Sequence, residues 1–125
     1  MKHILLVDDV EMIRRDLRSI LSADQFVTEE AARGETAVEM VRAANQAGNP
    51  FDLVVMDVRM PGGIDGVEAI RRIREFDRST RIVVYAAYAT YADNDLAAAN
   101  DGDMPLVMLK PASAAMIQAV AAGAY

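Results

Sequence analysis

Apolar segments of two kinds alternate along this chain of 125 residues. The short kind is a nearly continuous apolar run rich in Val, Ile and Leu, which is typical of a strand buried on both faces of a sheet. Such runs predict strands over residues 3–7, 51–56, 81–86 and 105–109. Residues 26–31, which include the polar run Thr28-Glu29-Glu30, are predicted as the remaining strand, the second along the chain.

The longer kind repeats apolar residues at helical spacing, which predicts an amphipathic helix after each strand. The shared apolar faces contain Met12, Ile13, Leu17, Ile20 and Leu21 in the first helix, Ala37, Val38, Val41 and Ala44 in the second, and Val67, Ile70 and Ile73 in the third. An alanine-rich stretch from Tyr91 to Asn100 predicts the fourth helix, and the last is expected to run through Ala122. Asp65 and Ser113 are the expected N-caps of the third and fifth helices, because their side-chain oxygens can accept an unpaired backbone N–H.

This alternation of strands and helices predicts an α/β fold with a parallel sheet and helices on both of its faces. No break in composition marks a boundary, so residues 1–125 are expected to form one domain. A chain of this length can bury enough surface to fold without disulfides.

The composition excludes several classes of function. The chain has no cysteine, which excludes disulfides, thiolate catalysis and zinc–thiolate sites. Its formal net charge of −6 argues against direct binding to nucleic acid. No apolar run is long enough to cross a membrane, and Met1–Val7 is too short for a signal peptide, so we expect a cytoplasmic protein. The basic run Arg71-Arg72-Ile73-Arg74 is interpreted as a solvated helix face with near-neighbour ion pairs.

Charged residues fall where the predicted strands end. Asp8 and Asp9 follow the first strand, Asp57 follows the third, and Lys110 follows the fifth. In open α/β sheets, ligands bind outside the carboxyl ends of the strands, where the strand order reverses. If the first and third strands are neighbours, three carboxylates meet in one small space.

Three neighbouring carboxylates repel one another, so such a site favours a bound cation. Oxygen ligands without Cys or His suit a hard ion, and Mg²⁺ is the natural candidate. A carboxylate beside that ion can attack phosphorus and form an acyl phosphate, with Lys110 as a positive charge for the phosphoryl oxygens. Each residue also has a simpler interpretation: Asp9 as a helix cap, Asp57 as an ordinary loop acid, and Lys110 as part of a strand terminator. His3 lies away from the cluster and is interpreted as structural or solvent-facing.

Four motifs in order identify a family resemblance that covers essentially the whole chain. The motifs are Ile4-Leu5-Leu6-Val7-Asp8-Asp9, Leu53-Val54-Val55-Met56-Asp57-Val58-Arg59-Met60-Pro61, Asp65-Gly66 and Leu109-Lys110-Pro111. Together they resemble the response-regulator receiver family. The resemblance implies a flavodoxin-like, doubly wound fold, with a five-stranded parallel sheet in the order 2-1-3-4-5 flanked by five helices.

The resemblance also assigns roles to single residues. It implies that Asp57 is the phosphoacceptor and that Asp9 and Asp57 bind Mg²⁺ directly, with Asp8 contributing mainly through water. The backbone carbonyl of Arg59 is expected to be a further ligand. Lys110 is expected to bind the phosphoryl group, with a cis peptide bond to Pro111.

Two positions depart from the family pattern. Ala86 stands where the family usually has Ser or Thr, so the usual hydroxyl contact to the phosphoryl group is missing. The candidates to replace it are Tyr85, Tyr88 and Thr90. Val107 stands where the family usually has a switch aromatic, so the common coupled movement of hydroxyl and aromatic is not available. An extra glycine, in Pro61-Gly62-Gly63-Ile64-Asp65, also lengthens the usual loop.

The leading hypothesis is a signalling module in two-component signal transduction. A histidine kinase or phosphotransfer protein would donate the phosphoryl group, and the chain would perform no enzymatic reaction beyond its own phosphorylation and dephosphorylation. One alternative is a degenerate receiver that acts as an interaction module without standard switching. Another is a metal-dependent phosphohydrolase, although Arg59 stands where such enzymes usually carry a second acid. The face formed by helix 4, strand 5 and helix 5 could bind an output domain or a second copy; its alanines are Ala97, Ala98, Ala119 and Ala122.

Overall fold

The computed structural model describes residues 1–23, 25–87 and 93–124. Strands and helices alternate through this part of the chain. In chain order the elements are β1 (Lys2–Val7), α1 (Glu11–Ile20), β2 (Phe26–Ala31), α2 (Gly34–Gln46), β3 (Leu53–Met56), α3 (Gly66–Arg74), β4 (Arg81–Ala86), α4 (Asp93–Ala99), β5 (Val107–Leu109) and α5 (Ala114–Ala121).

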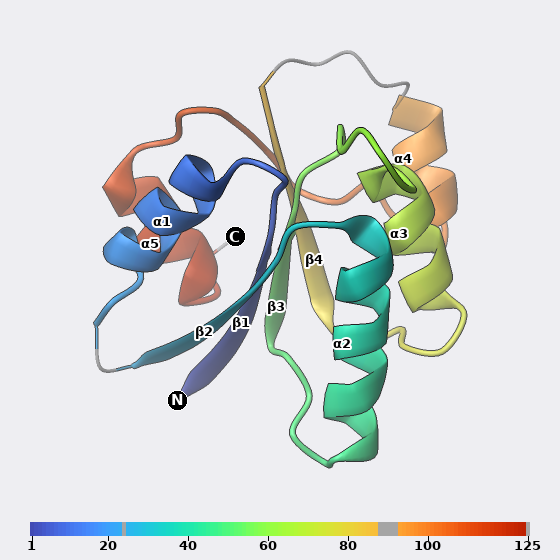
Figure 1. Ribbon diagram of the computed structural model, residues 1–125, viewed down its shortest axis with the longest axis horizontal. Helices are drawn as coiled ribbons and strands as arrows, with labels where there is room; N and C mark the ends of the chain where they lie inside the picture. The colour runs from blue at the N-terminus through green and yellow to red at the C-terminus, as the bar shows by residue number, and fades with distance from the viewer. Residues whose placement is uncertain (24, 88–92, 125) are drawn as a thin grey trace.

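The five strands form one parallel sheet in the order β2-β1-β3-β4-β5, which confirms the predicted topology. Helices α1 and α5 cover one face, and α2, α3 and α4 cover the other (Figure 1). β1 and β3 are direct neighbours, and β1 lies at the reversal of strand order between β2 and β3. The condition for convergence of the acids that follow these strands is therefore met.

Alternate side chains of each central strand enter different halves of the core. Leu5 and Val7 of β1 pack in the cluster under α2, α3 and α4, whereas Ile4 and Leu6 pack in the cluster on the α1 and α5 side. Successive side chains of a strand point to opposite faces, so a strand covered on both faces needs apolar residues at every position. This explains why the central strands β1, β3 and β4 contain continuous apolar runs, whereas the edge strand β2 does not.

The boundaries of several elements differ from the predicted ones. β1 begins at Lys2 rather than at His3, and α5 ends at Ala121 rather than at Ala122. β3 begins at Leu53 rather than at Phe51, and β5 begins at Val107 rather than at Pro105. Phe51 is buried all the same, and its carbonyl accepts the Thr80 hydroxyl at 3.2 Å. α4 begins at Asp93, and the predicted start of this helix at residues 91–92 lies outside the described residues.

Two predictions about side-chain burial were wrong. Met12 is 67% exposed and does not belong to the buried face of α1, on which Leu17 and Leu21 are buried. Arg74 does not lie on a solvated face with Arg71, because its side chain is buried. Its guanidinium donates to the Asn100 side chain at 2.7 Å and to the Asp77 carbonyl at 3.0 Å, and so links the end of α3 to the end of α4.

Both predicted N-caps are confirmed. The Asp65 carboxylate accepts the Glu68 N–H at 2.8 Å, and the Ser113 hydroxyl accepts the Met116 N–H at 3.1 Å. His3 is structural, as predicted: its ring stacks on Phe51 with 4.1 Å between the ring centroids. Among the described residues, no helix has the length and apolar character needed to span a membrane.

Candidate functional site

The predicted acids meet at the carboxyl edge of the sheet, which is the upper edge in Figure 1. The parallel ladder continues into both loops, because the Asp57 N–H donates to the Val7 carbonyl at 2.9 Å and the Asp8 N–H donates to the Ala31 carbonyl at 3.1 Å. Asp8, Asp9 and Asp57 each offer a carboxylate oxygen, and these oxygens lie within 4.8 Å of one another. Asp8 and Asp57 are buried, whereas Asp9 is exposed.

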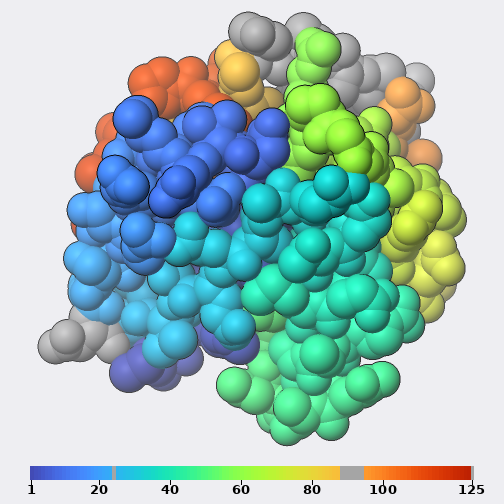
Figure 2. All heavy atoms as spheres, in the orientation of Figure 1, coloured from blue at the N-terminus to red at the C-terminus, as the bar shows by residue number. Residues whose placement is uncertain are grey.

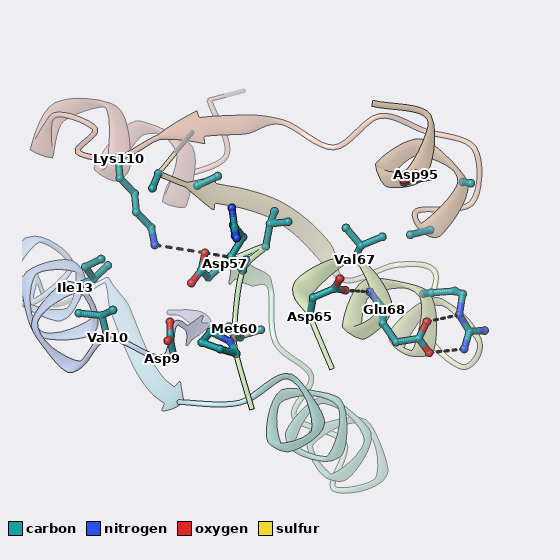
Figure 3. Close-up of a pocket in the computed structure, with 18 residues that line it drawn as sticks. Asp9, Val10, Ile13, Asp57, Met60, Asp65, Val67, Glu68, Asp95 and Lys110 are labelled. Carbon is teal, nitrogen blue, oxygen red and sulfur yellow. Dashed lines mark hydrogen bonds and ion pairs between the residues drawn. The ribbon is translucent and has the colours of Figure 1, made fainter. Parts of the chain in front are cut away.

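Lys110 reaches this cluster from the end of β5. Its ammonium lies 2.6 Å from an oxygen of Asp8 and 3.4 Å from an oxygen of Asp57. Figure 3 shows the Lys110 and Asp57 side chains pointing toward each other, with Asp9 on the neighbouring loop. The other oxygen of Asp8 accepts the Val10 N–H at 2.9 Å, so Asp8 is held on both sides. The peptide bond between Lys110 and Pro111 is cis, as predicted.

The charges of the site shift the pKa values of two groups. Burial, together with repulsion from Asp8, raises the pKa of Asp57 to about 6, although Lys110 and the Arg59 N–H act in the opposite direction. Burial tends to lower the pKa of Lys110, but its hydrogen bond to Asp8 and the charges of Asp57 and Asp8 outweigh this effect and raise it. Lys110 therefore keeps its positive charge at neutral pH. The ionised form of Asp57 is disfavoured in the cluster, and a further cation would stabilise it.

The donor set fits a hard divalent cation. The three carboxylates have oxygens within 4.8 Å of one another, and among the described residues Lys110 is the cation that forms ion pairs with Asp8 and Asp57. Repulsion between Asp8 and Asp57 nevertheless helps to raise the pKa of Asp57. Carboxylate oxygens in this number suit Mg²⁺ or a similar ion. Asp9 and Asp57 are placed to bind such an ion, and Asp8 is placed beside them. The part expected of the Arg59 carbonyl remains a prediction.

Gly66 fixes the backbone around Asp57 from the start of α3. Its N–H donates to the Val58 carbonyl at 2.8 Å. A Cβ at this position would overlap the Asp57 carbonyl oxygen and would lie only 2.8 Å from the Asp57 carbonyl carbon. Glycine at the first position of this helix is therefore required by a close approach of two backbone segments.

The lengthened loop between β3 and α3 is tied to the first turn of α2. Arg33 donates to the Gly62 carbonyl, and the Glu35 carboxylate accepts the Ile64 N–H at 3.3 Å. Gly62 has a φ of 91°, a conformation that glycine adopts at little cost. Figure 2 shows this yellow-green loop at the upper edge of the molecule, directly beside the cyan start of α2. These two hydrogen bonds hold the lengthened loop against the start of α2.

Arg14 is a residue of the site that sequence reasoning missed. Its guanidinium donates to the Asp8 carbonyl at 2.7 Å and to the Glu30 carboxylate at 3.1 Å. It therefore ties α1 and β2 to the loop that carries Asp8 and Asp9. The sequence signal for this role was a basic residue, Arg14, in the first turn of the predicted helix. Whether its side chain points toward the loop depends on how α1 packs, which the sequence does not show.

A cleft of about 1200 Å³ opens from the acid cluster toward α3 and α4. Ala86 lines this cleft together with Asp57 and Lys110. Figure 3 shows Asp95 on the opposite side of the cleft from Lys110. Ala86 offers no hydrogen-bond donor in its side chain. Of the candidates to replace the missing hydroxyl, Tyr85 lies on the other face of the sheet and its hydroxyl is bonded to the Ala112 N–H at 3.0 Å. Tyr88 and Thr90 lie outside the described residues.

Comparison with known families gives one match over nearly the whole chain. The family described as the response regulator receiver domain matches residues 4–122. This range contains all the acids of the site and Lys110.

Curated relatives agree with this match. The chain is 42% identical over 83 residues to the chemotaxis protein CheY of Halobacterium salinarum, which covers 66% of this chain and 64% of that protein. It is 43% identical over 97 residues to the two-component response regulator ORR41 of Oryza sativa subsp. japonica, which covers 76% of this chain and 73% of that protein. In a probable histidine kinase 2 of rice, the matching part is only 11% of the protein.

Solved structures share the fold. A chain in the crystal structure of the CheX-CheY-BeF3-Mg²⁺ complex from Borrelia burgdorferi superimposes with a TM-score of 0.79 and 27% sequence identity, covering 99% of this chain and 90% of that chain. The Vibrio cholerae chemotaxis protein CheY4 superimposes with a TM-score of 0.78 and 23% identity, which establishes likeness of fold alone.

Proposed function

Because this chain belongs to the response-regulator receiver family of two-component signal transduction, we propose that Asp57 accepts a phosphoryl group from a histidine kinase or phosphotransfer protein. One observation supports this role above the others. Asp57 is a buried carboxylate with a raised pKa, set within a triad of acids and only 3.4 Å from the Lys110 ammonium. Receiver domains interact with such donors, and residues 1–125 form one receiver domain in this proposal.

The reaction needs a nucleophile and positive charge at the phosphoryl oxygens. A carboxylate oxygen of Asp57 forms a bond to phosphorus, and the bond between phosphorus and the donor breaks, with its electron pair leaving on the donor. The Lys110 ammonium faces the phosphoryl oxygens and compensates their charge. Mg²⁺, when bound by Asp9 and Asp57 beside Asp8, supplies the further positive charge that the three carboxylates favour. Attack by water on the acyl phosphate releases phosphate and restores Asp57.

A direct experiment tests Asp57 as the acceptor. The protein is incubated with acetyl phosphate and Mg²⁺, and the intact mass is measured beside that of the Asp57→Asn variant. We expect a mass gain of one phosphoryl group in the wild-type protein alone. A gain in both proteins, or in neither, would reject the assignment.

The residues at β4 and β5 favour an output that differs from the common one. Ala86 has no hydroxyl, and Val107 pairs with Val84 across the strands and packs in the core cluster under α4. The expected coupling of a hydroxyl to an aromatic is therefore missing. If the phosphorylated protein shows no change in oligomeric state or in its NMR spectrum beyond the site, it acts as an interaction module without standard switching.

A phosphohydrolase acting on small substrates is less well supported. Such an enzyme usually carries a second acid two residues after the nucleophile, and Arg59 lines the cleft at that position. We therefore propose that the chain turns over only its own acyl phosphate. Output domains and a second copy remain candidate partners for the face of α4, β5 and α5.

A further inference from the structure

Tyr85 brings a hydroxyl group into the apolar cluster of described residues between the sheet and helices α1 and α5. It lies in β4 and is 6% exposed, next to Ala86 in sequence but on the opposite face of the sheet. A buried tyrosine hydroxyl costs free energy unless it has a hydrogen-bond partner. Its partner therefore indicates what this side chain does.

The side chain contacts the Lys110 segment at two points. Its hydroxyl oxygen accepts the Ala112 N–H at 3.0 Å, two residues beyond Lys110. Its ring lies under the Lys110 ammonium, with 5.7 Å between Nζ and the ring centroid. The negative face of an aromatic ring attracts a cation at this distance. Tyr85 thus holds both the backbone after Lys110 and the charged end of its side chain.

Lys110 needs such support because several groups compete for its ammonium. The ammonium lies closer to Asp8 than to Asp57, and a lysine side chain has many rotamers. Ala86 provides no hydroxyl for a phosphoryl oxygen, so a larger part of that contact falls to Lys110. A rigid ring on the third side of the ammonium limits it to positions between the two acids and the ring.

We infer that Tyr85 is a positioning residue that holds Lys110 for contact with the phosphoryl group. Tyr85 acts in this way only if Asp57 and Lys110 have the roles proposed above. The hydroxyl holds the backbone of the β5–α5 loop, and the ring holds the ammonium. A tyrosine that only filled the core would affect stability without a specific effect on the phosphoryl contact.

The test compares binding of two probes, Mg²⁺ alone and beryllofluoride at saturating Mg²⁺, in Tyr85→Phe and Tyr85→Leu. The Phe variant loses only the hydroxyl, and the Leu variant loses both contacts. We expect beryllofluoride binding to weaken by about threefold in Tyr85→Phe and by roughly tenfold in Tyr85→Leu, as the loss of one and of two weak contacts predicts. Mg²⁺ affinity should stay unchanged, because the interactions of Tyr85 in the described part of the chain are with Ala112 and Lys110 and not with the three acids.

Val83→Ala is the matched control, since Val83 lies in the same strand and the same cluster. It should lower the unfolding midpoint and leave beryllofluoride binding as in the wild type. The decisive comparison uses proteins that already carry Lys110→Ala. In these proteins, adding Tyr85→Leu should weaken beryllofluoride binding no further, because Tyr85 acts through Lys110. The inference would be overturned if Tyr85→Leu weakened beryllofluoride binding by the same factor with and without Lys110. It would also be overturned if a folded Tyr85→Leu variant bound beryllofluoride as tightly as the wild type.

The same data separate this inference from the proposed function. If the wild-type protein binds beryllofluoride and Lys110→Ala weakens that binding, the proposed function stands whatever Tyr85 does. If Lys110→Ala binds beryllofluoride as well as the wild type, the role proposed for Lys110 fails, and that of Tyr85 fails with it.

Discussion

The Lys110 ammonium lies 2.6 Å from a carboxylate oxygen of Asp8 and 3.4 Å from one of Asp57. The closer ion pair is therefore made with Asp8 and not with the proposed acceptor. Asp57 is left with partial compensation of its charge, which agrees with its raised pKa. The arrangement keeps Lys110 beside the acceptor while leaving room for a cation and a phosphoryl group.

Asp8→Asn should remove one negative charge from the acid cluster and break the closer ion pair of Lys110. The substitution removes the repulsion that helps to raise the pKa of Asp57, and it frees Lys110 to move toward Asp57. We expect the pKa of Asp57 to fall below 6 in the metal-free protein, as measured by NMR titration of its carboxyl carbon. Mg²⁺ affinity should fall roughly 10- to 100-fold, as is typical when a partner of direct metal ligands is lost. An unchanged pKa of Asp57 would show that burial alone sets it.

The stability of the metal-free protein should depend on the ionisation of Asp57. Its pKa is about 6 in the folded state and 3.8 by reference, so the folded state binds this proton more tightly than the unfolded state. Below about pH 4, Asp57 is protonated in both states and its ionisation does not reduce the free energy of unfolding. As the pH rises from about 4 to about 6, the free energy of unfolding falls, and above pH 6 this loss is constant. The total loss is on the order of 2–3 kcal/mol.

Asp57→Asn isolates this contribution from that of other titrating acids. Denaturant unfolding is measured from pH 4 to pH 7.5 with a chelator present. As the pH rises, the free energy of unfolding of the variant should increase relative to that of the wild-type protein. Excess Mg²⁺ should narrow the difference at pH 7.5, because the cation compensates the Asp57 charge. If the two proteins showed the same dependence of the free energy of unfolding on pH without Mg²⁺, the raised pKa of Asp57 would be contradicted.

Asp77 should have the opposite dependence on pH. Burial disfavours its charge, but hydrogen bonds from Thr80, Asn45 and Ser79 outweigh this and lower its pKa to about 2. Its stabilising contribution is complete above about pH 4 and is lost as the pH falls toward 2. Asp77→Asn should lower the free energy of unfolding at pH 7 by about 2 kcal/mol, measured by urea denaturation. Asp16→Asn, at an exposed position of α1, is the control and should have little effect.

Gly66→Ala should damage both the fold and the site. The added Cβ would collide with the backbone of Asp57, which cannot move aside as a flexible side chain could. We expect a loss of roughly 1–3 kcal/mol in the free energy of unfolding, together with weaker Mg²⁺ binding. Gly48→Ala is the control, because its φ of 73° makes alanine strained although no atom of the described residues lies within 4 Å of the new Cβ. That control should lose roughly 1 kcal/mol and keep its Mg²⁺ affinity.

Ala86→Thr should restore the missing hydroxyl contact. Ala86 lines the cleft beside Asp57 and Lys110, so a hydroxyl at this position can donate to a phosphoryl oxygen. Beryllofluoride binding should strengthen by roughly three- to tenfold, as one added hydrogen bond predicts. Ala86→Val has nearly the same shape without the hydroxyl and should show no such gain. Equal effects of Thr and Val would mean that side-chain volume, and not the hydroxyl, controls this position.

Much of the fold could be predicted from sequence because local patterns report it directly. Continuous apolar runs such as 4–7 and 82–84 predicted burial on both faces, and the caps at Asp65 and Ser113 lie where the sequence placed them. The failures came where a local pattern has two structural outcomes. Arg74 continues a basic run along α3, yet the docking of α4 buries it against Asn100. Met12 fits the helical period of α1, yet its side chain is 67% exposed, whereas the adjacent Ile13 packs against the core.

The sequence by itself determined which residues end which strands, because the alternation of short apolar runs with helical periods is a local property of the chain. It therefore located Asp8, Asp9, Asp57 and Lys110 at one edge of the predicted sheet. Only the tertiary structure decided the pairings within that edge. Lys110 and Asp8 are 102 residues apart, and Tyr85 reaches the Lys110 loop from the opposite face of the sheet from Ala86. Such contacts depend on strand order, helix docking and rotamers, which spacing along the chain does not encode.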